Sequence, residues 1–305
     1  MNPPAALLLT ADRRRSTGES HQALCALLSG SGRPLSIPAA LHTEQARLEA
    51  AVFQRVCAMG GVSEHPLGVV RVRPREDRLT LQLVDEPHVI GHWIDLLSPA
   101  VNEGMGDDPR DRVAGVPGLR SCREAGGIHL YRPGMAAVTL LSGFNPRWWE
   151  RTAGRRADPY GSLLRQPDWT AVEKAAYDAR AACPQDASAL LSPLLRRIRV
   201  TAGPGPVNST DVWTTGNGVR LETTDGPLCP DLIQLLTDGP CGLGWQVENK
   251  VCTCLCDHSH ARTGCTVNFR DPATARPVWY SNLKWGRTLE DRPETTARLN
   301  RSAFT

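Results

Sequence analysis

The spacing of apolar residues along the chain predicts several amphipathic helices. Leu48, Val52, Phe53 and Val56 recur at helical intervals, which predicts a helix from about 43 to 59 with one apolar face. Comparable patterns predict further helices at 19–28, 86–97, 169–182, 187–198 and 230–236, and one that begins at Asn145. Asp85 is expected to cap the helix at 86–97.

Alternation of apolar and polar residues predicts strands between these helices. Residues 68–72 and 78–84 are expected to pair around a turn, and residues 127–131 and 135–141 to form a second pair. A first strand is expected at 5–12, followed by a loop with three arginines. Later strands are expected at 219–223, 245–256, 265–270 and 278–285. This mixture of helices and strands predicts an α+β protein.

The length of the chain favours more than one domain. A protein of 305 residues is expected to form about two domains. Residues 202–208 contain two prolines and two glycines, so this segment is the best candidate for a linker. We therefore expect a mixed α/β N-terminal domain at 1–201 and a small, β-rich, zinc-stabilised C-terminal domain at 209–305.

Two segments of the chain resemble each other. Residues 79–87 and 219–227 each combine an alternating run with an Asp-x-Pro turn, and a helix is expected after each. The repeat indicates either duplicated α+β units or a common way of starting a helix, and of these we favour the second.

Cysteine and histidine residues are concentrated near the end of the chain. They are Cys241, Cys252, Cys254, Cys256, His258, His260 and Cys265. Zinc prefers four sulfur or imidazole ligands in a tetrahedron. Alternate residues of a strand share one face, and a hairpin would bring Cys265 against Cys254 or Cys256. With His258 or His260 as a further ligand, and Cys241 and Cys252 in reserve, the segment predicts a structural zinc site.

Disulfides or buried thiols are the alternatives for these cysteines. No apolar run is long enough to span a membrane, and the run at 5–9 is too short for a signal peptide. We therefore expect a cytoplasmic protein without membrane contact. Reduced cysteines and bound metal are favoured in that compartment.

Charge alone does not indicate a nucleic-acid partner, because the net charge is only +3. Two local clusters do so: Arg13, Arg14 and Arg15, and the run with Arg147, Trp148 and Arg151. Arginines bind phosphates, and aromatic rings stack on bases. We expect these groups to contact nucleic acid or a protein partner, whereas an exposed loop and a helix rim are the simpler explanations.

Two alternatives would make the protein an enzyme, and the sequence leaves catalysis open. Asp257-His258-Ser259-His260, followed by Thr263-Gly264, resembles the core of His-Me finger nucleases. That resemblance implies a metal-dependent nuclease in which His258 is the general base and Asp257 supports the metal.

The second alternative is a palm-like phosphoryl-transfer enzyme. Asp12 and Asp77 each adjoin an expected strand, as the metal-binding carboxylates of such enzymes do. Two-metal chemistry needs carboxylates close to a shared pair of ions.

Overall fold

The computed structural model describes residues 3–30, 35–57, 61, 63–102, 107–160, 163–183, 186–203, 208–251 and 264–283. Their helices are α1 (Pro3–Thr17), α2 (His21–Gly30), α3 (Thr43–Val56), α4 (Pro87–Leu97), α5 (Pro146–Tyr160), α6 (Ala171–Ala181), α7 (Ser188–Leu195) and α8 (Cys229–Thr237), with short 3₁₀ helices η2 (Pro66–Gly68), η3 (Pro109–Asp111) and η4 (Ile198–Thr201). Their strands are β1 (Val69–Pro74), β2 (Leu79–Leu83), β3 (Ala100–Val101), β4 (Val113–Ala114), β5 (Arg120–Glu124), β6 (Gly127–Tyr131), β7 (Val138–Ser142), β8 (Ser209–Thr215), β9 (Gly218–Thr224), β10 (Gln246–Val251), β11 (Gly264–Arg270) and β12 (Pro277–Leu283). The expected mixed α+β class is confirmed.

Two five-stranded sheets dominate the fold and share one topology. Their strand orders are β1-β2-β7-β6-β5 and β8-β9-β12-β11-β10. In each sheet a hairpin is followed by a helix and then by three antiparallel strands. The last of these strands lies parallel to the second strand of the hairpin: β7 beside β2, and β12 beside β9.

The repeated sequence segments occupy equivalent places in these two units. Residues 79–87 and 219–227 each supply the second strand and the turn that leads into α4 or α8. The two parallel pairings also correspond, with Leu79 opposite Thr139 and Val219 opposite Val278. Our preference for a mere helix-start pattern was therefore wrong, because the segments belong to units of the same topology.

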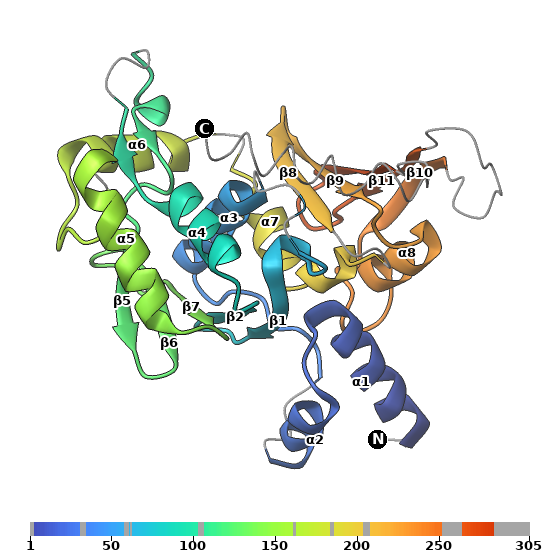
Figure 1. The fold of residues 1–305 in the computed structure, drawn as a ribbon. Helices are drawn as coiled ribbons and strands as arrows, with labels where there is room; N and C mark the ends of the chain where they lie inside the picture. The colour runs from blue at the N-terminus through green and yellow to red at the C-terminus, as the bar shows by residue number, and fades with distance from the viewer. Residues whose placement is uncertain are drawn as a thin grey trace, which may run out of the picture.

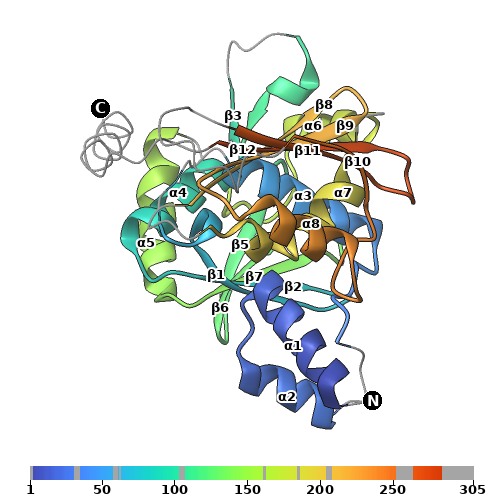
Figure 2. The same ribbon diagram turned by 90° about the vertical axis from the view of Figure 1, so that its right-hand side faces the viewer.

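A layer of helices separates the two sheets. Figure 2 shows α3, α4, α7 and α8 between them, and α3 packs against α7 as well as β7 and β8. The apolar face of α3 is buried as its spacing predicts, with Leu48, Val52 and Phe53 inaccessible to solvent. Buried residues of both sheets belong to one continuous hydrophobic core. The division into domains at 1–201 and 209–305 stays a prediction.

A polar network lies at the centre of this helix layer. Glu49 of α3 and Arg196, just after α7, are both fully buried, with Nε–Oε2 and Nη2–Oε1 distances of 2.8 and 2.6 Å. Ser192 and Gln45 also donate hydrogen bonds to the Glu49 carboxylate. Arg196 donates further to the carbonyls of Pro38 and Arg75. The network joins α3 to α7 with its buried charges paired.

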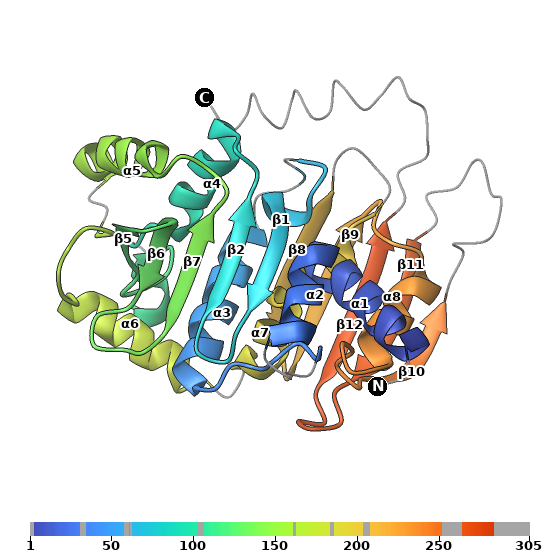
Figure 3. The same cartoon turned by 90° about the horizontal axis from the view of Figure 1, so that it is seen from below.

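The largest error in the expected elements concerns the start of the chain. Residues 5–12 were expected to form a strand, but they lie in helix α1, which packs beside α2 outside the two sheets (Figures 1 and 3). A short apolar run suits either structure, and prolines are tolerated in the first turn of a helix. The helix α4 is capped by Glu86 instead of Asp85, without a side-chain hydrogen bond. None of the described helices combines the length and apolarity that crossing a membrane requires.

Candidate functional site

Most of the expected zinc ligands lie outside the described residues. These are Cys252, Cys254, Cys256, His258 and His260, and Asp257 lies there too. The hairpin itself is present, since β10 and β11 pair with Val251 opposite Thr266. Cys265 is fully buried in β11, within the hydrophobic core. Across the described ranges no three His, Cys, Asp or Glu side chains are grouped as a metal site would require. Zinc binding therefore stays a prediction.

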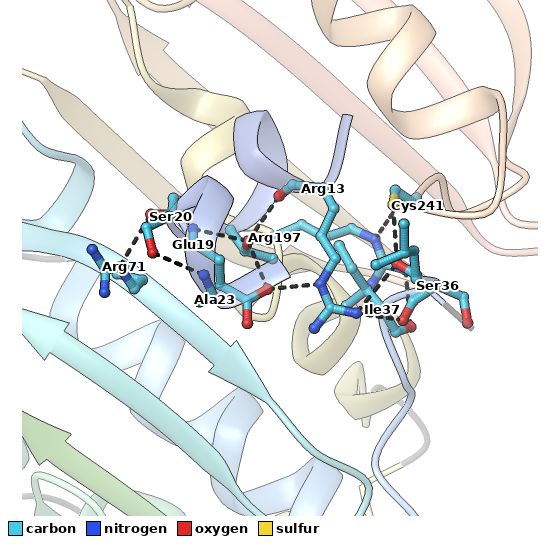
Figure 4. Close-up of polar contacts among 12 residues, drawn as sticks. Arg13, Glu19, Ser20, Ala23, Ser36, Ile37, Arg71, Arg197 and Cys241 are labelled. Atoms are coloured by element: carbon cyan, nitrogen blue, oxygen red, sulfur yellow. Dashed lines mark hydrogen bonds and ion pairs between the residues drawn. The ribbon is translucent and has the colours of Figure 1, made fainter. Parts of the chain in front are cut away.

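Cys241 belongs to a buried hydrogen-bond network near α1 (Figure 4). Its Sγ donates to the Leu35 carbonyl at 3.5 Å, and its own carbonyl accepts from Arg197 Nε at 2.7 Å. Burial raises the pKa of the Cys241 thiol to about 11, although the charges of Arg13 and Arg197 act in the opposite direction. The thiol is therefore protonated at neutral pH and serves as a packing group here.

The first expected basic cluster is partly buried. Arg13 lies on α1 and is 5% exposed, with its Nε 2.7 Å from Glu19 Oε2. It also donates to the carbonyls of Leu35 and Ser36. Figure 4 shows Arg13 beside Glu19 and Ser36. Arg14 is exposed, and Arg15 lies 3.3 Å from Asp231. The expected loop is a helix, and Arg13 anchors that helix instead of facing solvent.

The second expected cluster is exposed on α5. Arg147, Trp148 and Arg151 face solvent, and the Arg151 guanidinium lies 5.1 Å from the centre of the Trp148 ring. Trp149 is buried and donates to Ser121 Oγ, so only one of these two adjacent tryptophans faces the core. Figures 1 and 3 place α5 and α1 on opposite sides of the molecule, so the two clusters do not form one surface. A nucleic-acid or protein contact at α5 stays a prediction.

Of the two aspartates of the palm-like hypothesis, Asp77 lies in the turn before a strand, as expected, and Asp12 does not adjoin a strand. Asp12 lies on helix α1, not at the end of a strand. Asp77 lies in the turn between β1 and β2, where the hydrogen bond and charge of Arg78 lower its pKa. Asp77 thus has a cationic partner within the chain.

A cavity that the sequence did not predict lies between α3, α6, α7, β8 and the segment around η3. Its volume is about 520 Å³. Among the described residues, five arginines and three aspartates line it: Arg47, Arg55, Arg110, Arg132, Arg180, Asp108, Asp111 and Asp186. The remaining wall is largely apolar. The lining therefore carries a formal excess of two positive charges.

Among the described residues, ion pairs neutralise two of the five arginines. Arg47 pairs with Asp186 at 3.1 Å and with Glu44 at 3.1 Å, and Arg110 forms an ion pair with Asp108. The carboxylate of Asp108 has its pKa lowered to about 2 by those Arg110 contacts. In the described part of the chain, no carboxylate forms an ion pair with the other three arginines: Arg55, Arg132 and Arg180.

Arg132 is the most buried of these three. It follows β6, is 3% exposed, and donates from Nε to the Pro117 carbonyl at 3.2 Å. Its guanidinium lies 4.8 Å from the centre of the Tyr177 ring, whose hydroxyl donates to Glu44. Its Nη1 is buried and has no hydrogen-bond partner within the described chain. Burial lowers the pKa of Arg132 to about 10, while nearby Tyr177 and Glu44 favour the charged form.

Like charges lie close together along the cavity wall. Burial, followed by the charges of Arg55 and Arg132, lowers the pKa of Arg180 to about 10. Arg180 donates to the carbonyls of Val113 and Arg110, which orient it without neutralising it. Burial also lowers the pKa of Arg55, against the favourable charge of Asp111. Such a group of guanidinium ions is the kind of environment in which proteins bind anions.

No protein-family model matches this chain, and the searches of curated proteins and of solved structures give no match either. The cavity is therefore interpreted from its own geometry. Sequence reasoning missed it because its three unneutralised arginines are far apart along the chain and form no local pattern. The spacing of apolar residues in α3 and α6 predicts which face of each helix is buried. It does not predict that Arg55 of α3, Arg132 after β6 and Arg180 of α6 line the same cavity.

Proposed function

We propose that this protein is a binding protein for a small anionic molecule, which it takes up in the arginine-lined cavity. The observation that carries the proposal is Arg132, a guanidinium that is almost fully buried and keeps an unused Nη1 donor beside the cavity. Arg55 and Arg180 line the same space without ion-paired carboxylates in the described chain. An oxyanion would accept hydrogen bonds from this group and relieve its mutual repulsion.

Two other buried arginines differ from Arg132 because each is paired with a carboxylate. Arg196 pairs with Glu49, and Arg120 pairs with Glu173 through two hydrogen bonds of 2.9 Å. An unpaired buried charge costs several kcal/mol, so folded proteins rarely keep one without a function. The planar guanidinium fits carboxylate and phosphate oxygens in a two-pronged arrangement. The cavity thus has the chemistry of an anion site.

Isothermal titration calorimetry with citrate and with inorganic phosphate, at constant ionic strength, tests this function. We expect saturable binding that Arg132→Met weakens at least tenfold. The matched control is Arg151→Met, since Arg151 also stacks on an aromatic ring, 5.1 Å from its centre, but lies exposed on α5. That variant should bind as the wild type does.

Thermal unfolding adds an independent measurement. A ligand at one hundred times its Kd should stabilise the wild type by about 2.7 kcal/mol. Without ligand, Arg132→Met should be no less stable than the wild type, because it removes a buried charge without a carboxylate partner. Absence of binding by both anions and by the phenyl phosphate and phenyl sulfate used below, or equal binding by Arg132→Met, would refute the proposed function.

A further inference from the structure

We infer that the ligand is an organic phosphate monoester with a planar aromatic body, its phosphate at Arg55, Arg132 and Arg180 and its ring on Trp213. This inference rests on the proposed function and makes it more specific. It draws on the charge of the lining, the size of the cavity and the position of one tryptophan.

The charge of the lining selects the head group. Five guanidinium groups face three carboxylates, so the described lining has two positive charges in excess. Glu44 lies one hydrogen bond away, on the Tyr177 hydroxyl, and shares Arg47 with Asp186. Of the remaining lining charges, Arg110 pairs with Asp108, so Arg55, Arg132 and Arg180 together with Asp111 keep the excess of two positive charges. A phosphate monoester carries about −1.5 to −2 charges near pH 7. A carboxylate or a sulfate ester carries a single negative charge and would leave part of the excess uncompensated.

The cavity is larger than a phosphate requires. A volume of about 520 Å³ falls within the range of roughly 300–1,000 Å³ typical of sites for whole organic ligands. The apolar part of the lining includes Ala50, Ala51, Val116, Leu191 and Val212. An inorganic ion would leave this part of the lining hydrated, whereas an ester would cover it with its organic part.

Trp213 provides a surface for that organic part. It lies on β8, lines the cavity and is 39% exposed, and the guanidinium of Arg220 lies 6.0 Å from its ring centre. A large aromatic side chain left accessible at the edge of a cavity is suited to stacking against a planar ring. Because Trp213 and the arginines line the same space, one molecule can contact both.

The test compares three probes by calorimetry: phenyl phosphate, phenyl sulfate and inorganic phosphate. The two esters share a ring and a tetrahedral head group and differ in charge. We expect phenyl phosphate to bind at least tenfold more tightly than either of the others. Comparable binding of phenyl phosphate and phenyl sulfate would overturn the choice of a phosphate, although the proposed function would stand. Failure of all three probes, and of citrate, would remove the proposed function itself.

A pair of variants tests the aromatic contact. Trp213→Leu should weaken phenyl phosphate about tenfold and leave inorganic phosphate unchanged. The matched control is Trp148→Leu on α5, because Trp148 is also 39% exposed and also lies beneath an arginine. The intrinsic fluorescence of the wild type and of Trp148→Leu should respond to phenyl phosphate, and that of Trp213→Leu should respond less. An unchanged affinity of Trp213→Leu for phenyl phosphate would overturn the aromatic part of the inference.

Discussion

The buried pair of Glu49 and Arg196 allows the sharpest test of how this fold is stabilised. We expect Arg196→Met to be strongly destabilising, because it leaves the Glu49 carboxylate buried without a counter-ion. Both side chains are 0% exposed, and the two nitrogen–oxygen distances are 2.8 and 2.6 Å. Removing one member of such a pair costs about 3–5 kcal/mol. The carbonyls of Pro38 and Arg75 would each lose a donor as well, at about 1 kcal/mol apiece.

The expected loss is therefore at least about 5 kcal/mol, a large share of the roughly 5–15 kcal/mol typical of a folded protein. Urea unfolding followed by circular dichroism measures it. The matched control is Arg78→Met, since Arg78 pairs with Asp77 at 2.9 Å but both side chains are about half exposed. Exposed pairs contribute about 0–1 kcal/mol, so that variant should remain close to the wild type.

A double-mutant cycle separates the pair from its surroundings. Combining Arg196→Met with Glu49→Leu removes both charges, so the double variant should be less destabilised than the sum of the two single variants by about 2–3 kcal/mol. Additive losses would show that the two side chains do not interact energetically. A loss below about 1 kcal/mol for Arg196→Met alone would refute the assignment of a buried, uncompensated charge in that variant.

Three further predictions concern other buried groups. Burial alone would raise the pKa of Glu173, but hydrogen bonds and charge from Arg120 outweigh burial and lower the pKa. The pair therefore stabilises the fold above about pH 4.3, and this contribution is lost as the pH falls through the lowered pKa. In urea unfolding, the stability difference between the wild type and Glu173→Gln should shrink on acidification, and a growing difference would contradict this reasoning. Because the pKa of Cys241 is raised to about 11, iodoacetamide at pH 8 should alkylate this thiol at least about tenfold more slowly in the folded protein than in the unfolded chain. Equal alkylation rates, measured by peptide mass spectrometry, would contradict this prediction. The buried thiol should also stabilise the fold below about pH 8.5, and this contribution should be lost as the pH rises towards the folded-state pKa. Trp149→Ala should cost about 3–5 kcal/mol in urea unfolding, and Trp148→Ala, at an exposed position of the same helix, less than about 1 kcal/mol; equal losses would contradict the assignment of Trp149 to the core.

The elements that could be predicted from the sequence are those whose own periodicity defines them. The helix α3 and the pairing of β1 with β2 follow from local patterns. The strands β5 and β8 were missed. The sequence of β5, RSCRE, offers little alternation, and that of β8, STDVWTT, has few apolar positions, so neither predicts a strand alone. They are strands because β6 and β9 provide hydrogen-bonding partners.

The candidate site could be predicted even less. The arginine cluster at 13–15 predicted a binding surface, but Arg13 is buried and anchors α1. Most of the Cys/His cluster that predicted a metal site lies outside the described residues. The three arginines of the cavity without an ion pair in the described chain lie one each in α3, after β6 and in α6. Only the packing of those elements brings their guanidinium groups together, so no spacing rule applied to one segment would find them.

The partners of the buried arginines separate structural from functional positions in this chain. Arg13, Arg120 and Arg196 each meet a buried carboxylate. Arg197 has no ion-paired carboxylate among the described residues but donates to four backbone carbonyls, so its donors are used within the fold.

Arg132 differs from all four of these arginines. It is as buried as they are, yet in the described chain it makes a single hydrogen bond and has no carboxylate partner, whereas Arg120, whose buried Nε also has no hydrogen-bond partner, is paired with Glu173. The wall around it combines the end of β6 from the first unit with β8 from the second, together with α3, α6 and α7. The other buried arginines named above have a carboxylate or several carbonyls as partners. The free-energy cost of burying Arg132 without a carboxylate partner arises where the two units of shared topology meet. An anion there would offset the cost and at the same time bridge the two units, because it would contact residues of both.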